Sequence, residues 1–163
     1  MRKMTILKCD HIGILVKDVD EALKTYSKVF DWTEKDIIGP FEWKYKGSSE
    51  IVKIAFGKVG NIYLEIIAPV TPGVTADTLE KRGEGVHHIA FVSDNIEKEW
   101  KKLKERGLRL VSEKPEVDDW GTIYWFIHPK SLHRVMFEII GGPEYSEGGK
   151  GTEVYRQPPK QTQ

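Results

Sequence analysis

An internal repeat constrains the fold of this 163-residue chain more than any other feature of its sequence. When the sequence is laid over itself so that His11 falls on His88, HIGILVKDVDEALKTYSKVF matches HIAFVSDNIEKEWKKLKERG in apolar spacing and in its polar break. Further along, IYLEIIAP and VMFEIIGGP share an identical Glu-Ile-Ile. A repeat of this length indicates two copies of one supersecondary unit.

Each copy begins with a short apolar strand that leads into an amphipathic helix. In the first copy, Asp18 suits the N-cap position and Glu21 follows three residues later, a relative of the capping box. In the second copy, Gly107 is expected to end the helix. Helical i, i+3, i+4 stripes follow the two starts, formed by Val19, Ala22, Leu23, Tyr26 and Phe30, and by Ile96, Trp100 and Leu103.

Strand pairs are expected after each helix. SSEIVKIAFGKVGNIYLEII predicts two strands joined by a turn at residues 58–61, and TIYWFIHPKSLHRVMFEII predicts two strands joined by a turn at residues 128–132. A short helix is expected at about residues 76–82, between the copies. From Gly141 on the sequence loses periodicity, and residues 144–163 are expected to form a polar tail that is mobile or docked on a partner surface.

Each copy carries a histidine on its first strand and a glutamate on its last. Because side chains alternate along a strand, His11 shares its face with Gly13, and His88 shares its face with Ala90. His87 points to the other face with Ile89 and Phe91. A small residue therefore stands beside His11 and His88, and only these two histidines occupy equivalent positions.

The glutamates are Glu65 and Glu138, each between apolar neighbours. A buried carboxylate must be paired, protonated or bound to a metal. A single such histidine is usually structural, and a single such glutamate often faces water on an edge strand. The repeat places all four at equivalent positions, which favours a mixed N/O site for a divalent ion formed by His11, Glu65, His88 and Glu138.

Composition limits the classes of partner and compartment. Lys and Arg together number 25 and so do Asp and Glu, so the composition does not indicate the basic face that non-specific nucleic-acid binding requires, and no nucleic-acid partner is expected. No apolar run approaches the length of a membrane span. Cys9 is the only cysteine, so no internal disulfide is available and a cytoplasmic protein is expected.

With these motifs the chain resembles the vicinal oxygen chelate superfamily, which includes glyoxalases, bleomycin resistance proteins and dioxygenases. DHIGILVKDVDEAL, RGEGVHHIAF, and HPKS followed by FEII are most similar to the methylmalonyl-CoA epimerases. The resemblance implies an α+β fold in which two βαβββ modules form a cupped mixed β-sheet with helices on the outer face. It implies one domain at residues 1–143, with repeats at about 8–70 and 85–143, before the 144–163 tail.

The resemblance also implies a function. Its ligand positions match His11, Glu65, His88 and Glu138, and the cofactor is a divalent ion, Co, Zn, Ni, Mn or Fe. The expected chemistry removes a proton beside a metal-bound carbonyl and stabilises the enolate. Glu138 is the first candidate for the base, with Glu65 the other catalytic carboxylate. A small-molecule substrate, such as a CoA thioester, and a homodimer are implied as well.

The chain departs from the epimerase pattern at three places. Lys53 stands nearest to the position where some epimerases carry a second catalytic glutamate, with Glu50 close by. HPKSLHRV has His133 and Arg134 where epimerases have small residues, as in HPKSxGGV. Aromatic side chains, which fit either a more aromatic pocket or core and dimer contacts, stand at Trp43, Tyr45, Trp120, Tyr124 and Trp125.

These departures put methylmalonyl-CoA itself in question as the substrate. The candidate substrate-binding residues are Lys53, Trp125 and Lys130, and Arg134 could join Lys130 at a phosphate or carboxylate. A lactoylglutathione lyase-type isomerase would use the same four ligands, although HPKS is not typical of it. A ring-cleaving dioxygenase needs two His and one carboxylate, so Glu65 counts against it. A metal-free binding protein of the same superfamily is the remaining alternative.

Overall fold

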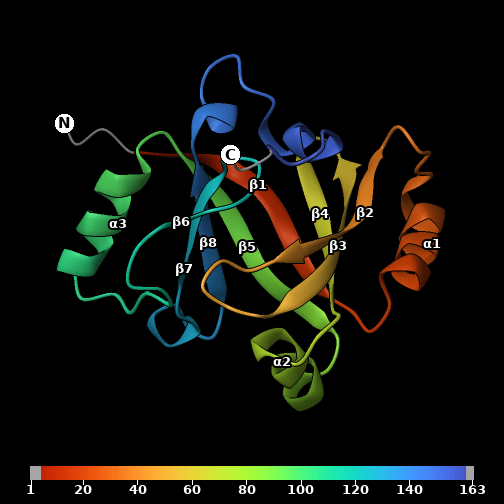
Figure 1. The fold of residues 1–163 in the computed structure, drawn as a ribbon, viewed down its shortest axis with the longest axis horizontal. Helices are drawn as coiled ribbons and strands as arrows, with labels where there is room; N and C mark the ends of the chain where they lie inside the picture. Colours follow the sequence, from red (N-terminus) through yellow and green to blue (C-terminus); the bar gives the residue numbers. More distant parts are fainter. Residues whose placement is uncertain (1–4, 161–163) are drawn as a thin grey trace. The chain divides into compact units, whose positions relative to one another are not determined.

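The computed structural model describes residues 5–160, and its helices and strands are labelled in Figure 1. The chain divides into two compact units, one made of residues 11–87 and the other combining the residues up to Asp10 with those from His88 onward. One boundary falls after Asp10, inside the first strand, and the other falls after His87, directly before His88. Each unit therefore carries one copy of the repeat.

The first copy consists of a strand, a helix and three further strands. β1 is parallel to β4, whereas β2 with β3 and β3 with β4 are antiparallel, and the strand order is β2-β3-β4-β1. A helix, α2, follows this copy. The bounds are β1 Ile6–Leu15, α1 Val19–Phe30, β2 Ile37–Lys44, β3 Ile51–Val59, β4 Ile62–Pro69 and α2 Val74–Arg82.

The second copy repeats this pattern in the order β5-β8-β7-β6. β5 is parallel to β8, and the other pairs are antiparallel. The predicted α+β arrangement of two βαβββ modules with mixed strands is therefore confirmed. The bounds are β5 Gly85–Ser93, α3 Ile96–Glu105, β6 Glu116–Val117, β7 Ile123–Ile127 and β8 Met136–Gly141, with short 3₁₀ helices η1 Pro129–Ser131, η2 Pro143–Tyr145 and η3 Gly151–Arg156.

The helix starts follow their capping residues. The Asp18 carboxylate accepts a hydrogen bond from the Glu21 amide at 3.0 Å, and the Asn95 side chain accepts one from the Lys98 amide at 3.0 Å. α2 begins at Val74, two residues before the expected start. Its first turn is supported from elsewhere in the chain, because the Glu50 carboxylate accepts a hydrogen bond from the Thr75 amide at 2.6 Å.

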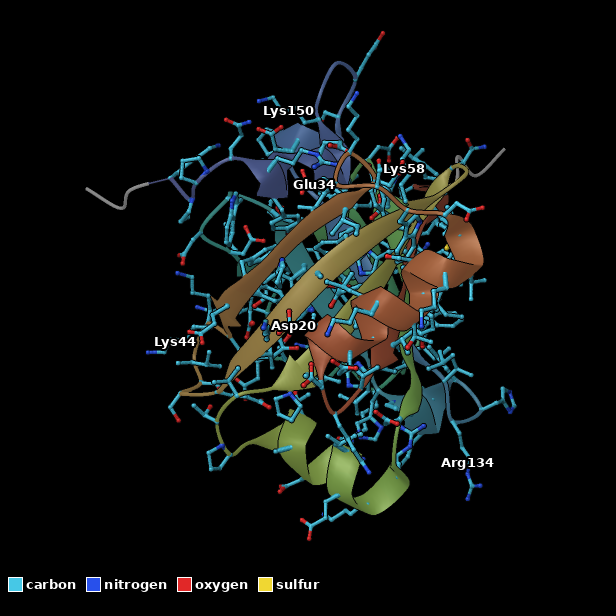
Figure 2. The ribbon with its side chains drawn as sticks, turned by 90° about the vertical axis from the view of Figure 1, so that its right-hand side faces the viewer. Asp20, Glu34, Lys44, Lys58, Arg134 and Lys150 are labelled. Carbon is cyan, nitrogen blue, oxygen red and sulfur yellow. The ribbon has the colours of Figure 1, made fainter. Side chains whose placement is uncertain are left out.

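In each unit a helix covers one face of the strands. α1 packs on a core that includes Ala55 of β3 and Ile66 of β4. Figure 2 views the chain from the α1 side and labels Asp20, which forms an ion pair of 2.6 Å with Lys53 of β3. In the other unit, α3 packs on Trp125 and Ile139. The opposite faces of these strands are therefore the ones left to carry the histidines and glutamates.

The C-terminal segment packs on its own unit rather than standing away from it. Thr152 and Val154 of η3 are buried. The Thr152 hydroxyl donates to the Asp10 carboxylate at 2.6 Å, the Tyr155 hydroxyl donates to Asp118 at 2.7 Å, and the Trp120 indole donates to the Gln157 carbonyl at 2.8 Å. The sequence favoured a mobile or partner-docked tail because the segment has no apolar period. Buried and partly buried hydrogen bonds, which leave no such period, hold it instead.

Among the helices within residues 5–160, none is long and apolar enough to cross a membrane.

Candidate metal centre

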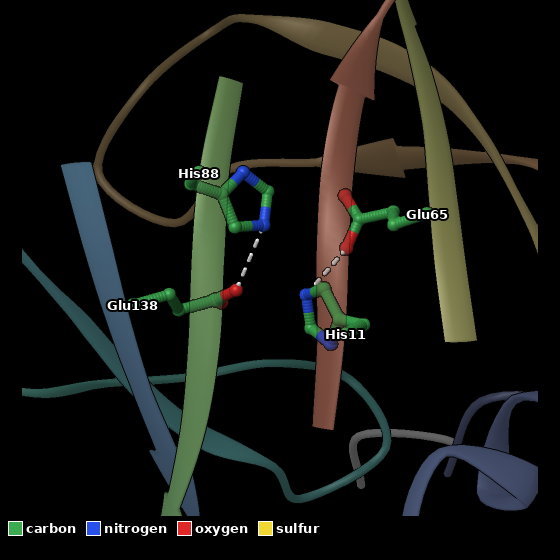
Figure 3. A group of neighbouring side chains, drawn as sticks. All are labelled: His11, Glu65, His88 and Glu138. Atoms are coloured by element: carbon green, nitrogen blue, oxygen red, sulfur yellow. Dashed lines mark ion pairs between the residues drawn. The ribbon is translucent and has the colours of Figure 1, made fainter. Parts of the chain in front are cut away.

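The first His–Glu pair lies in the unit of residues 11–87. His11 of β1 and Glu65 of β4 are each only 4% exposed, and His11 Nε2 lies 2.9 Å from Glu65 Oε2 (Figure 3). Parallel pairing sets Gly13 directly opposite Glu65, so the neighbouring strand places no side chain there. Phe56 of β3 pairs with Glu65 on its other side and meets the His11 ring edge-on at 5.7 Å.

The second pair repeats this arrangement in the other unit. His88 of β5 and Glu138 of β8 are 2% and 5% exposed, and His88 Nε2 lies 3.1 Å from Glu138 Oε2 (Figure 3). Ala90 is directly opposite Glu138, as Gly13 is opposite Glu65. Phe126 of β7 pairs with Glu138 and meets the His88 ring edge-on at 5.8 Å.

The side chains of the two pairs fit a metal ion by their chemistry. His11, Glu65, His88 and Glu138 are buried and each offers one nitrogen or oxygen ligand atom. Two buried carboxylates need positive charge nearby, which either a protonated imidazole or a divalent cation supplies. Imidazole nitrogen together with carboxylate oxygen is the ligand set that Zn, Co, Ni and Mn accept.

Phe56 and Phe126 are site residues that the sequence alone did not reveal. Each is the cross-strand neighbour of a glutamate and an edge-on contact of a histidine. The repeat could have identified them, because each phenylalanine lies on the strand that precedes the strand of its glutamate. The two distances in sequence differ, however, because β3 and β4 are joined by a tight turn, whereas β7 and β8 are joined through η1 and residues up to Val135.

Two expected substrate-binding residues lie on the wrong face of their strands. Lys53 points toward α1, where it pairs with Asp20, while its strand neighbours of the other parity include Phe56 beside His11. Trp125 is fully buried in the core beneath α3, whereas the adjacent Phe126 faces His88. Their assignment to substrate is therefore corrected: strand alternation turns both side chains away from the His–Glu pairs.

Most of the other expected pocket aromatics have structural contacts. Trp120 packs against Tyr155 of the C-terminal segment at 5.1 Å, and Trp43 packs against Tyr45 at 5.1 Å. Tyr124 meets Phe126 edge-on at 6.1 Å, on the face that carries His88. The aromatic surroundings of the second pair thus come from Tyr124 and Phe126, while Trp43 pairs with Val52 on the face of β3 that carries Phe56.

Glu50 and Lys130 are also held apart from the pairs by their local contacts. Glu50 is 6% exposed and caps α2 through its bond to the Thr75 amide. Lys130 is exposed in the turn between β7 and β8, where its amide donates to His128 Nδ1 at 3.1 Å. Neither side chain has a recorded bond to a His–Glu pair in the described part of the chain.

Trp125→Ala is expected to lower the free energy of unfolding by about 3–5 kcal/mol, because it removes a fully buried side chain from the α3 core. Urea unfolding measures the loss, and the metal content of the folded fraction should stay unchanged. Trp43→Ala, which truncates a half-buried tryptophan, should cost clearly less. A Trp125→Ala protein that stays stable but loses metal would restore Trp125 to the site.

The chain is similar in sequence to a known superfamily and to individual proteins. A sequence model of the Glyoxalase/Bleomycin resistance protein/Dioxygenase superfamily matches residues 10–126. YqjC, an uncharacterized protein of Bacillus subtilis, is 29% identical over 133 residues, covering 81% of this chain and 90% of YqjC. Mitochondrial methylmalonyl-CoA epimerase of Dictyostelium discoideum is 26% identical over 139 residues, covering 84% of this chain and 80% of that enzyme.

A solved structure extends the likeness to the fold. A Streptomyces coelicolor methylmalonyl-CoA epimerase variant in complex with 2-nitronate-propionyl-CoA matches with a TM-score of 0.70 at 24% identity, covering 85% of this chain and 99% of that one. At this identity the match concerns the fold alone. It agrees with the module arrangement described above.

Proposed function

The chain belongs to the Glyoxalase/Bleomycin resistance protein/Dioxygenase superfamily, and from that premise we propose that it is a divalent-metal-dependent epimerase or isomerase. It would remove and return a proton on the carbon next to a carbonyl group. The observation that carries the proposal is the pair of equivalent, buried His–Glu contacts, one in each unit. Its relationship to methylmalonyl-CoA epimerases supports a CoA thioester as the substrate.

In this proposal His11, Glu65, His88 and Glu138 together hold one divalent ion. When bound, the ion would supply the positive charge that stabilises an enolate oxygen as the proton leaves. The two imidazoles provide neutral nitrogen ligands, and the two carboxylates offset the charge of the cation. Because all four side chains are buried, few water molecules compete with them for the ion.

Glu138 is the proposed base, which accepts the proton from the carbon, and inversion of that carbon requires a second group that returns a proton from the opposite face. The carboxylate is 5% exposed, and only Ala90 stands opposite it on β5, so a substrate carbon meets little steric obstruction from that strand. Phe126 and Phe56 border the two glutamates with apolar rings, which orient the imidazoles and limit water. The reacting carbon is thereby shielded from direct protonation by water, and solvent deuterium reaches it through the carboxyl group of the base.

A lactoylglutathione lyase-type isomerase is the second candidate. The presence of both glutamates favours it equally, because that chemistry uses the same two nitrogen and two oxygen donors. Epimerase and lyase chemistry differ in substrate, so supplying each substrate in turn separates the two. A ring-cleaving dioxygenase is less well supported, because Glu65 matches Glu138 in burial and in its contact with a histidine.

The Co²⁺-loaded protein is expected to exchange the C2 hydrogen of methylmalonyl-CoA with solvent deuterium, because proton removal and return at that carbon is the proposed chemistry. Mass spectrometry of the recovered thioester measures the incorporation. The chelated protein serves as the control and should show no exchange. Absence of exchange in the Co²⁺-loaded protein, alongside active conversion of a hemithioacetal of glutathione, would replace the epimerase proposal by the lyase.

A further inference from the structure

The connection between β7 and β8, together with Arg109 from the segment between α3 and β6, carries basic side chains that lack acidic partners among residues 5–160. Arg109, Lys130, His133 and Arg134 are exposed, and within the described residues none of them forms an ion pair with a carboxylate. Other basic residues of the chain do pair, as Lys101 does with Glu97 and Arg156 with Glu153. Arg109, Lys130 and Arg134 therefore carry positive charge that no carboxylate in the described chain contacts directly.

Hydrogen bonds hold this basic turn in one conformation. The Arg109 amide donates to the Ser131 hydroxyl at 2.8 Å, and the His128 amide donates to the Arg109 carbonyl at 2.8 Å. The Lys130 amide donates to His128 Nδ1 at 3.1 Å. Burial, together with the positive charges of Arg109 and Lys130, lowers the pKa of His128, which keeps its ring neutral and able to accept that bond.

Two consecutive residues of the turn adopt a backbone conformation that side chains disfavour. His133 has φ 54° and Arg134 has φ 73°, both in the left-handed region where glycine is usual. Backbone strain of this kind clusters at functional sites, which motivates a functional explanation for these two residues. Figure 2 shows the Arg134 side chain extending away from the ribbon, so packing does not account for its presence.

We propose that this turn binds the phosphate groups of an anionic ligand, with Arg134, Lys130 and Arg109 as the charged contacts. Arginine and lysine bind phosphate through charge-assisted hydrogen bonds, and the arginine fork can do so bidentately. The ligand is the nucleotide end of a CoA thioester, an identification that rests on the proposed function.

The position of the turn agrees with such a ligand. Met136, two residues after Arg134, pairs with His88, so the turn lies at the end of β8 nearest that histidine. In a CoA thioester the pantetheine arm separates the phosphates from the reacting carbonyl. Phosphates at the exposed turn would therefore leave the carbonyl free to reach the buried His88 and Glu138.

Two substitutions of Arg134 separate its charge from its backbone strain. Arg134→Gln and Arg134→Gly should each weaken CoA binding at least about tenfold, measured by calorimetry, because both remove a charge-assisted contact. Only Arg134→Gly should raise the thermal unfolding midpoint, by roughly 1–4 °C, because glycine relieves the left-handed strain. Arg82→Gln makes the same change on α2 and should leave CoA binding unaltered.

Two further ligands show which phosphate group of CoA the turn binds. Competition by inorganic pyrophosphate would assign the turn to the pyrophosphate group, and weaker binding of 3′-dephospho-CoA would assign it to the 3′-phosphate. Equal CoA affinity in the wild-type, Arg134→Gln and Arg134→Gly proteins would overturn the proposal, as would a wild-type protein that binds none of these ligands. Since calorimetry with CoA requires no turnover, a protein that binds CoA but fails to exchange deuterium contradicts only the epimerase chemistry.

Discussion

His88→Ala should lower the affinity of the protein for Co²⁺ or Zn²⁺ by about 100-fold or more, whereas His87→Ala should leave that affinity almost intact. His88 is 2% exposed with Nε2 3.1 Å from Glu138, so alanine removes a nitrogen ligand and the contact between the histidine and this carboxylate. Metal analysis after dialysis and a competition titration with a coloured chelator measure the difference.

His87 is the control for His88, because it is the adjacent residue on β5 and its side chain points to the other face of the strand. His87 is half-buried and lies on the face that β5 turns toward Phe91 and the α3 core. Its loss should cost stability, about 1 kcal/mol, rather than metal. Equal metal affinity in His88→Ala and wild type would refute the four-ligand centre. Loss of metal in His87→Ala alone would move the site to the other face of the strand.

The sequence predicted structural features that depend on neighbouring residues or that occur in both copies of the repeat. Asp18 and Glu21 lie within one helical turn, so the capping interaction could be predicted from their spacing. The faces of β1 and β5 followed from alternation, because the small residues Gly13 and Ala90 recur two positions after the histidines. The repeat was informative because equivalent positions in the two copies support the same strand face, whereas either position alone allows both faces.

Contacts between segments that are far apart in the sequence could not be predicted from local spacing or from the repeat. Trp125 and Phe126 are both aromatic, and only the register of β7 with β8 decides which of them faces His88. The early start of α2 depends on Glu50, which stands far from that helix in sequence. The C-terminal segment is fixed by buried hydrogen bonds such as Thr152 with Asp10, which leave no periodic pattern.

Glu138→Gln is expected to lower the rate of solvent proton exchange about 10²- to 10⁴-fold, the usual contribution of a general base. Glutamine keeps the size of the side chain and an oxygen ligand, but its amide cannot accept the proton. Metal affinity should therefore fall far less than the exchange rate. Single-turnover deuterium incorporation measures the rate, and metal content determined on the same sample normalises it.

Glu65→Gln is the matched control, because Glu65 has the same burial and the equivalent histidine contact in the other unit. If Glu138 is the base, Glu65→Gln should reduce exchange mainly through weaker metal binding, and added metal should restore much of the rate. Added metal should not rescue Glu138→Gln, since the missing group is the proton acceptor. The opposite pattern, rescue of Glu138→Gln and not of Glu65→Gln, would transfer the role of base to Glu65. A similar loss without rescue in both variants would indicate that the two carboxylates act on opposite sides of one carbon, which epimerisation requires and which a single base cannot perform.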